Sequence, residues 1–151
     1  LGVRELIDDY RLLMADVYEV AGSSRRTSEA LAATAGQTAA RWHVLSVVSE
    51  EPLSVAASAR RLGLARQSVQ RVVNDLRDDG LVRLQPDPGD RRAPLVEVTE
   101  RGGKVLAELQ TSSAQNRNRM LAATGLTATD LRQARSTLRA LAAALRDAAS
   151  P

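Results

Sequence analysis

The sequence of 151 residues contains no cysteine and no phenylalanine, and His43 is its single histidine. Without cysteine the chain can form no disulfide bond, thiolate nucleophile, thiol redox sensor or cysteine-bound zinc site. A single histidine excludes histidine pairs and the metal chemistry that depends on them. We therefore expect neither a metal nor a cofactor. Aromatic residues make up only 2% of the chain, so alanine, leucine and valine must build the core, and this composition favours helix.

Excess charge of one sign is also scarce. The sequence has 21 basic and 18 acidic residues, which give a formal charge of +3, although the pI is near 10.1. This charge is too small for a polybasic tail, so a nucleic-acid role would depend on where the arginines lie. Long apolar runs and a signal-peptide layout are missing too, and we expect a cytoplasmic chain that does not bind a membrane.

Both ends of the chain have helical patterns. Apolar residues at steps of three and four predict an amphipathic helix over residues 3–21, broken at residues 22–24 and followed by another helical stretch over Thr27–Ala35. Near the other end, residues 127–130 resemble a capping box. These apolar faces need a partner, either within the monomer or across a two-fold axis. The face of the last helix consists of Leu131, Ala134, Leu138, Leu141 and Leu145.

The middle of the chain predicts three consecutive helices. Thr38 is a good N-cap for the first, which we expect to end before Pro52. Ser54 can cap a short second helix that ends at Gly63. A third follows between Leu64 and Gly80, and the last two together form a helix-turn-helix pattern.

The second helix of this pattern has two different faces. Its apolar residues, from Val69 to Leu76, follow helical spacing, and the opposite face carries amides and an arginine without an acid. In the DNA major groove a bidentate arginine suits guanine, and a bidentate glutamine or asparagine suits adenine. Two residues of the first turn can reach phosphates or base edges. We predict that the DNA-binding residues of this helix are Arg66, Gln67, Ser68, Gln70, Arg71 and Asn74.

A β-hairpin is predicted directly after this helix. Residues 81–84 and 95–98 have strand composition, and the segment between them predicts a long loop with Arg91 and Arg92 at its tip. Because Pro94 cannot donate a hydrogen bond, we expect regular pairing to begin after it. Such a loop suits a narrow, electronegative minor groove, so the hairpin is interpreted as a wing.

A polar helix face is often just the solvent-exposed face. Three neighbouring features favour DNA binding here: the short helix ended by glycine, the polar stripe without acids, and the arginine-tipped hairpin. The acids Asp75, Asp78 and Asp79 lie off the stripe or at the helix end, where they would not face the phosphates.

These segments resemble the MarR-type winged-helix transcriptional regulators of bacteria and archaea. The resemblance extends from Thr38 to Leu145 and is carried by residues 38–45, by residues 53–64 and by the wing segment, residues 87–102. It implies a mostly α fold with a small β-hairpin wing (α+β), built as a winged helix-turn-helix core with N- and C-terminal dimerisation helices.

The resemblance also implies a domain layout. A single domain covers residues 1–151, with the winged helix-turn-helix over residues 38–99 and dimerisation helices in residues 1–36 and 100–151. Thr99 can cap the helix that follows the wing, which we expect to reach about Leu121.

The functional expectation is a homodimer that binds a pseudo-palindromic operator in double-stranded DNA. The resemblance implies that Asp90 orients the wing arginines and that Arg92 is the principal minor-groove residue. It further implies a repressor that a small phenolic or anionic ligand releases. The alternative is a winged-helix protein-interaction module without specific DNA binding. We expect no enzyme, since the sequence has no nucleophile elbow and no glycine-rich phosphate loop.

Two positions depart from the family pattern. Ala65 lies where an N-capping Asp, Ser or Thr is common, so this helix start should be softer. Ser58 replaces a usually buried leucine, so either the core is thinner there or the hydroxyl bonds back to the helix.

Three residues are candidates for an effector site: Tyr18, Trp42 and His43. For each of them packing is the alternative interpretation, with Trp42 in the core, His43 packed or half-exposed, and Tyr18 in a helix interface.

Overall fold

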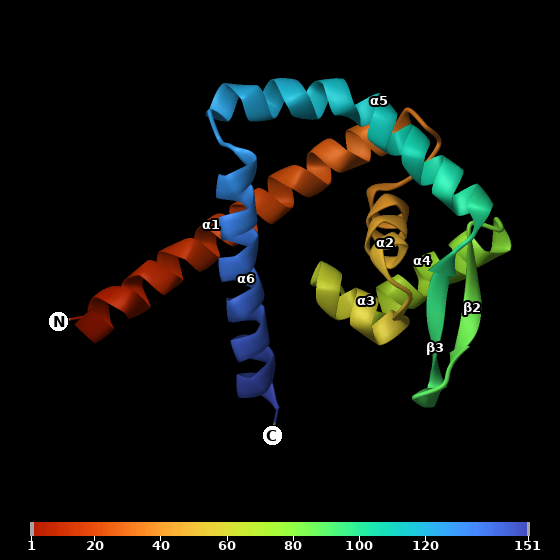
Figure 1. Cartoon of the computed structure of the whole chain (residues 1–151), viewed down its shortest axis with the longest axis horizontal. Coiled ribbons are helices and arrows are strands. Elements are labelled where there is room, and N and C mark those ends of the chain that lie inside the picture. Colours follow the sequence, from red (N-terminus) through yellow and green to blue (C-terminus); the bar gives the residue numbers. More distant parts are fainter. Residues whose placement is uncertain (1, 151) are drawn as a thin grey trace. The chain divides into compact units, whose positions relative to one another are not determined.

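The computed structural model describes residues 2–150 (Figure 1). Over these residues it has six helices and a small antiparallel sheet, which confirms the predicted mostly α fold with a wing. The chain divides into two compact units, the first ending at Ser112 and the second beginning at Ser113. None of the described helices is long and apolar enough to cross a membrane.

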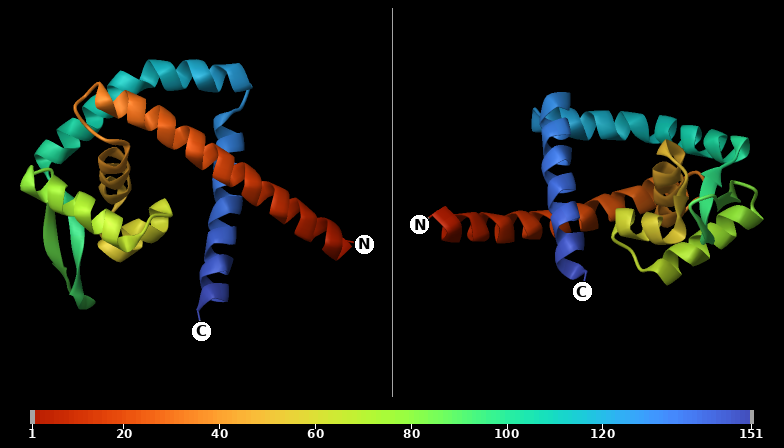
Figure 2. Two further views of the ribbon diagram at one scale, coloured as in Figure 1. Left: turned by 180° about the vertical axis from the view of Figure 1, so that it is seen from behind. Right: turned by 60° about the horizontal axis from the view of Figure 1, so that its bottom comes forward.

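Helix α1 is one continuous helix over Gly2–Ala33, so the predicted break at residues 22–24 is wrong. A glycine inside a helix costs only about 1 kcal/mol. The hydroxyl of Thr27 also bonds back to the carbonyl of Ser23 at 3.0 Å, which is compatible with uninterrupted helix. Near its C-terminal end α1 buries Ser28 and Ala32, whereas its N-terminal half extends away from α2, α3 and α4 (Figures 1 and 2).

Helix α2, Ala39–Glu50, begins where the sequence predicts. The hydroxyl oxygen of Thr38 accepts a hydrogen bond from the Arg41 backbone N–H at 3.2 Å, and Glu29 of α1 accepts one from Ala39 at 3.1 Å. Since these bonds satisfy free N–H groups of the first turn, the helix has a defined start. Its buried residues are Ala39, Trp42, Val44, Leu45 and Val48.

The helix-turn-helix consists of α3, Val55–Leu62, and α4, Arg66–Asp78. Ser54 caps α3 by accepting a hydrogen bond from Ala57, as predicted, and Gly63 ends it in the left-handed conformation with φ 65°. Ala65 makes no side-chain cap bond to the first turn of α4, so the softer start expected there stays a prediction.

The sheet contains one strand that sequence reasoning missed. β1, Leu53–Ser54, pairs with β3, Asp90–Val98, and β3 pairs with β2, Val82–Asp87, in the order β1-β3-β2. Two residues are too short for a periodic pattern, so only the partner strand defines β1.

The hairpin differs from the predicted long loop. Regular pairing runs from Val82↔Val98 to Gln85↔Leu95, so it begins after Pro94 as expected. Beyond a bulge the strands pair again at Asp87↔Asp90, which leaves a tight turn at the tip. Arg91 and Arg92 therefore lie on β3 next to the tip, and their predicted place in a loop is wrong.

The core of the first unit lies between α2, α3, α4 and the sheet. The face of α4 that was predicted to pack is buried, with Val69, Val73 and Leu76 at 0% exposure. Ser58 is also fully buried, and its hydroxyl has no hydrogen-bond partner. The proposed bond back to the helix is therefore absent at this position.

Helix α5, Glu100–Thr124, begins in the first unit and ends in the second, so it is longer than predicted. The Thr99 hydroxyl oxygen accepts a hydrogen bond from Gly102 at 3.1 Å, which confirms the predicted cap. A Cβ atom at Gly102 would lie 2.0 Å from the carbonyl oxygen of Leu81. The start of α5 therefore approaches the wing backbone at a distance that only glycine allows.

Helix α6, Ala128–Ala149, starts with the predicted capping box. The backbone N–H and the hydroxyl of Thr127 donate to the Asp130 carboxylate, and these bonds lower the pKa of Asp130. None of the side chains of this helix is buried.

Candidate nucleic-acid interface

The predicted base-reading residues share the outer face of α4. Gln67, Gln70 and Arg71 are exposed and Asn74 is half-buried, while the opposite face of the helix packs in the core. Arg66 and Ser68 are exposed in the first turn. The fold thus presents all six side chains away from the core. A helix that reads bases in the major groove needs such a solvent-facing set of polar side chains.

Two of these side chains contact each other. Nε2 of Gln70 donates a hydrogen bond to Oδ1 of Asn74 at 3.0 Å, one helical turn away. The bond uses one of the two amide hydrogens of Gln70 and leaves its carbonyl oxygen free. An adenine edge needs one donor and one acceptor from such an amide, and Gln70 still offers both.

The arginines of this face are electrostatically available. Among residues 2–150, Arg66 and Arg71 form no ion pair. Asp75 and Asp78 are also exposed on this helix, and Asp78, four residues after Asn74, lies at the C-terminal end of the same outer face. Positive charge on the outer face therefore lies at Arg66 and Arg71, before the acids near the C-terminal end of the helix.

The wing carries a second pair of available arginines. Arg91 and Arg92 are exposed on β3, and within the described chain no acid pairs with either guanidinium group. Asp90 accepts a hydrogen bond from the backbone N–H of Arg92 at 3.0 Å, and Asp87 accepts one from Gly89 at 2.9 Å. Asp90 thus fixes the backbone at Arg92 rather than its side chain.

Positive charge nearer the base of the wing is neutralised internally. Nε of Arg83 donates to Glu97 at 2.8 Å across β2 and β3, and Gln85 donates to the same carboxylate. The hydrogen bond and the charge of Glu97 raise the pKa of Arg83. The available charge of the hairpin therefore concentrates near its tip.

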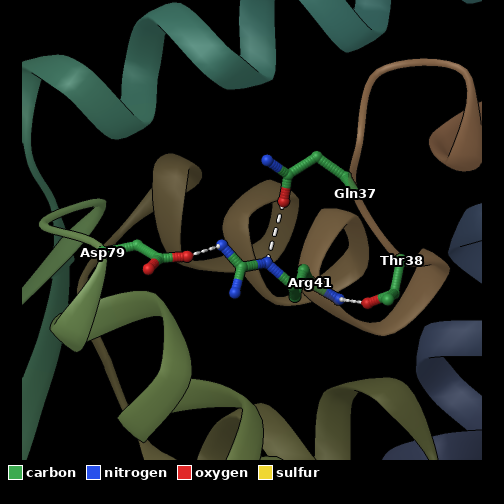
Figure 3. Close-up of polar contacts among 4 residues, drawn as sticks. All are labelled: Gln37, Thr38, Arg41 and Asp79. Atoms are coloured by element: carbon green, nitrogen blue, oxygen red, sulfur yellow. Dashed lines mark hydrogen bonds and ion pairs between the residues drawn. The ribbon is translucent and has the colours of Figure 1, made fainter.

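The C-terminal end of α4 is held by groups that the sequence analysis did not identify. Nη2 of Arg41 on α2 pairs with the Asp79 carboxylate at 2.5 Å, and Nε of Arg41 donates to Gln37 at 2.8 Å (Figure 3). The Thr99 hydroxyl donates to the carbonyl of Gly80 at 2.7 Å. Arg41 and Asp79 are 38 residues apart and Thr99 and Gly80 are 19 apart, so no local pattern signals these two contacts.

The three effector-site candidates have different environments. Trp42 packs in the core at 2% exposure, as the packing interpretation expected, and His43 is half-buried on α2. Tyr18 is 71% exposed on α1. Residues 2–150 contain no group of three or more acidic or histidine side chains that could hold a metal ion.

Comparison with known proteins places these features in context. The sequence model of the MarR family matches residues 35–93. An uncharacterised protein of Mycobacterium tuberculosis is 44% identical over 139 residues, which cover 92% of this chain and 96% of that protein. The crystal structure of the transcriptional regulator BldR from Sulfolobus solfataricus aligns with a TM-score of 0.74 and 27% identity, over 88% of this chain and 96% of that one.

Two further structures share the fold. CouR from Rhodococcus jostii, bound to p-coumaroyl-CoA, aligns with a TM-score of 0.67 and 24% identity, over 91% of this chain and 94% of that one. The M. tuberculosis regulator MosR, in complex with DNA, aligns with a TM-score of 0.65 and 20% identity, over 91% of this chain and 98% of that one.

Proposed function

Because the chain belongs to the MarR family of DNA-binding transcriptional regulators, we propose that it binds a specific double-stranded operator as a homodimer. In this proposal α4 reads bases in the major groove through Arg66, Gln67, Ser68, Gln70, Arg71 and Asn74. The wing arginines, Arg91 and Arg92, enter the neighbouring minor groove, with Asp90 fixing the backbone between them.

One observation carries the proposal: exposed arginines that form no ion pair among residues 2–150 lie on both elements that a winged helix presents to DNA. Uncompensated guanidinium groups on an exposed face attract phosphate and suit bidentate contacts with guanine. A protein-binding face would more often offer buried apolar anchors at its centre, and the outer face of α4 is polar.

The dimer is proposed from the helices outside the winged part. In α6 the large side chains Leu131, Leu138 and Leu145 are 41–45% exposed in the single chain, and the N-terminal half of α1 exposes Leu6 and Ile7. Residues 1–36 and 100–151 would then associate across a two-fold axis, with residues 38–99 as the DNA-binding part. The two recognition helices would lie about one DNA turn, roughly 34 Å, apart.

We further propose repression that a small phenolic or anionic ligand relieves. A chain without cysteine and with one histidine has no thiol or histidine-cluster chemistry for sensing, which leaves organic ligands or no effector at all. CouR, which shares the fold, binds an aromatic acyl thioester of that kind. Trp42, His43 and Tyr18 remain the candidate contacts.

The test is selection of bound duplexes from a random pool with the full chain, followed by salt titration on the selected sequence. Arg71→Ala should cost ~1–3 kcal/mol and relax preference at one base position. Arg92→Ala should weaken binding across sequences and reduce the salt slope. Arg139→Ala, an exposed arginine of α6, is the charge-matched control and should leave duplex affinity unchanged.

Equal affinity of wild type, Arg71→Ala and Arg92→Ala for the selected duplex would contradict the assignment of these residues. A wild-type chain without measurable duplex affinity at low salt would favour the protein-interaction module instead. Repetition of the selection with phenolic acids and their thioesters tests the effector class, because a true effector must reduce duplex binding.

A further inference from the structure

The recognition helix α4 is fastened at its C-terminal end by two contacts from different elements. Arg41 of α2 is largely buried, with 16% of its side chain exposed, and it pairs with Asp79, the residue that ends α4. From the other side, Thr99 at the start of α5 donates to the carbonyl of Gly80 at 2.7 Å. Partial burial strengthens a charge-assisted bond relative to an exposed pair.

The guanidinium of Arg41 is itself held in place. Its Nε donates to Gln37, in the turn between α1 and α2, and the backbone N–H of Arg41 is capped by Thr38 (Figure 3). These bonds and the partial burial of Arg41 oppose a movement of its guanidinium group with Asp79. Because the guanidinium of Arg41 is held in place, its bond to the Asp79 carboxylate attaches the end of α4 to α2.

The opposite end of α4 lacks such an attachment. Ala65 provides no side-chain cap, and the first turn with Arg66 and Gln67 is exposed. The buried Val69, Val73 and Leu76 hold one face of α4 in the core, and the contact at Asp79 adds a polar attachment at the C-terminal end that the first turn lacks. An angular change there displaces side chains near the first turn by the largest distance.

We propose that Asp79 is a positioning residue for DNA recognition, and that its pairing with Arg41 sets the orientation in which α4 meets the major groove. The role rests on the proposed function, because it presumes that α4 reads DNA. In this role the negatively charged Asp79 increases the affinity of the protein for DNA, although DNA is itself negatively charged. Simple electrostatics predicts the opposite sign, since a carboxylate near DNA repels phosphate.

The opposite signs make the test sharp. Asp79→Asn preserves size and removes the charge. The neighbouring Asp78→Asn removes an equal charge at the same helix end, from an acid that forms no ion pair among residues 2–150. We expect Asp79→Asn to bind the selected duplex about tenfold more weakly, the scale of one charge-assisted hydrogen bond. Asp78→Asn should bind equally or more tightly. Asp79→Glu, which keeps a carboxylate for Arg41, should restore most of the affinity.

A second measurement examines the attachment without DNA. The amides of Gly80 and Leu81 donate to Arg77 and Leu76, at 2.9 Å each. Their hydrogen exchange should become faster in Asp79→Asn and in Arg41→Gln, and it should stay at the wild-type rate in Asp78→Asn. The double variant should exchange no faster than either single variant, because both changes remove one contact.

Each outcome decides the proposal. Weaker binding and faster exchange in Asp79→Asn alone support it. Equal or tighter binding by a folded Asp79→Asn, as in Asp78→Asn, overturns the positioning role and leaves the proposed function intact. If the wild-type protein binds no duplex of the random pool, the proposed function is overturned, and the positioning role with it. Circular dichroism and thermal unfolding establish that each variant is folded.

Discussion

The winged part, residues 38–99, and helix α6 both contain helices with side-chain N-caps, yet they are stabilised in different ways. In the winged part Val44, Leu45 and Val96 are completely buried. In α6 no side chain is buried, and Leu138 is 41% exposed although it lies on a continuous apolar face. The first region therefore gains stability from burial within its own chain, whereas the second has local hydrogen bonds and an apolar face that stays exposed.

The largest expected effect comes from equal truncations in the two regions. Leu45→Ala should destabilise the winged part by ~2–5 kcal/mol, because it removes a fully buried side chain and leaves a cavity. Chemical denaturation followed by fluorescence measures this directly, because the only tryptophan of the sequence, Trp42, lies in the same core. The midpoint should fall at every protein concentration.

Leu138→Ala is the matched change in α6. At concentrations where the chain is monomeric it should alter the unfolding midpoint little, as expected for a surface position. Its effect should appear in the dimer dissociation constant measured by analytical ultracentrifugation, since each buried leucine contributes about 1.5–3 kcal/mol. A variant that loses winged-part stability but associates normally would reverse the comparison.

The features that the sequence predicts well are those coded locally. Helical periodicity identified the buried face of α4, and the caps at Thr38, Ser54 and Thr127 are hydrogen-bonded as expected. These signals work because N-cap geometry and side-chain periodicity depend on neighbours within one or two turns. The outer face of α4 is exposed for the same reason, since it is the complement of the buried face.

Features that depend on partners distant in the sequence were not predicted. The strand β1 exists only because β3 pairs with it, and the hairpin is longer than predicted because its strands pair again beyond the bulge. The attachment of Asp79 to Arg41 joins helices that only the fold brings together. Composition alone gave these contacts no signature, although they position the candidate DNA-binding surface.

The next expected effect on stability comes from a substitution at the start of α5, where this helix leaves the winged part. Gly102→Ala would place a methyl group 2.0 Å from the carbonyl oxygen of Leu81, which is backbone and cannot rotate away. We expect a loss of ~1–3 kcal/mol, as for overpacked positions. Gly103→Ala is the control, because nothing lies within 4 Å of its Cβ position and alanine favours helix by about 0.5–1 kcal/mol. Thermal unfolding should shift in opposite directions in these adjacent variants, and a shared direction would contradict the close approach.

The smallest expected effect concerns an unpaired buried hydroxyl group in the winged part. Ser58 is completely buried in α3 and its hydroxyl has no hydrogen-bond partner. An unsatisfied buried polar group costs free energy, so Ser58→Ala should stabilise the winged part by about 1 kcal/mol. Denaturant unfolding followed by Trp42 fluorescence should show a higher midpoint with an unchanged slope.

Ser54→Ala provides the opposite case one turn earlier. Its hydroxyl caps α3 through the 3.1 Å bond from Ala57, so its removal should cost ~0.5–2 kcal/mol. The same chemical change thus raises stability at one serine of this segment and lowers it at another. A destabilising effect of Ser58→Ala would contradict this prediction. It would mean that the Ser58 hydroxyl forms a hydrogen bond in solution and that no polar group of the core around α3 is left unpaired there by Ser58.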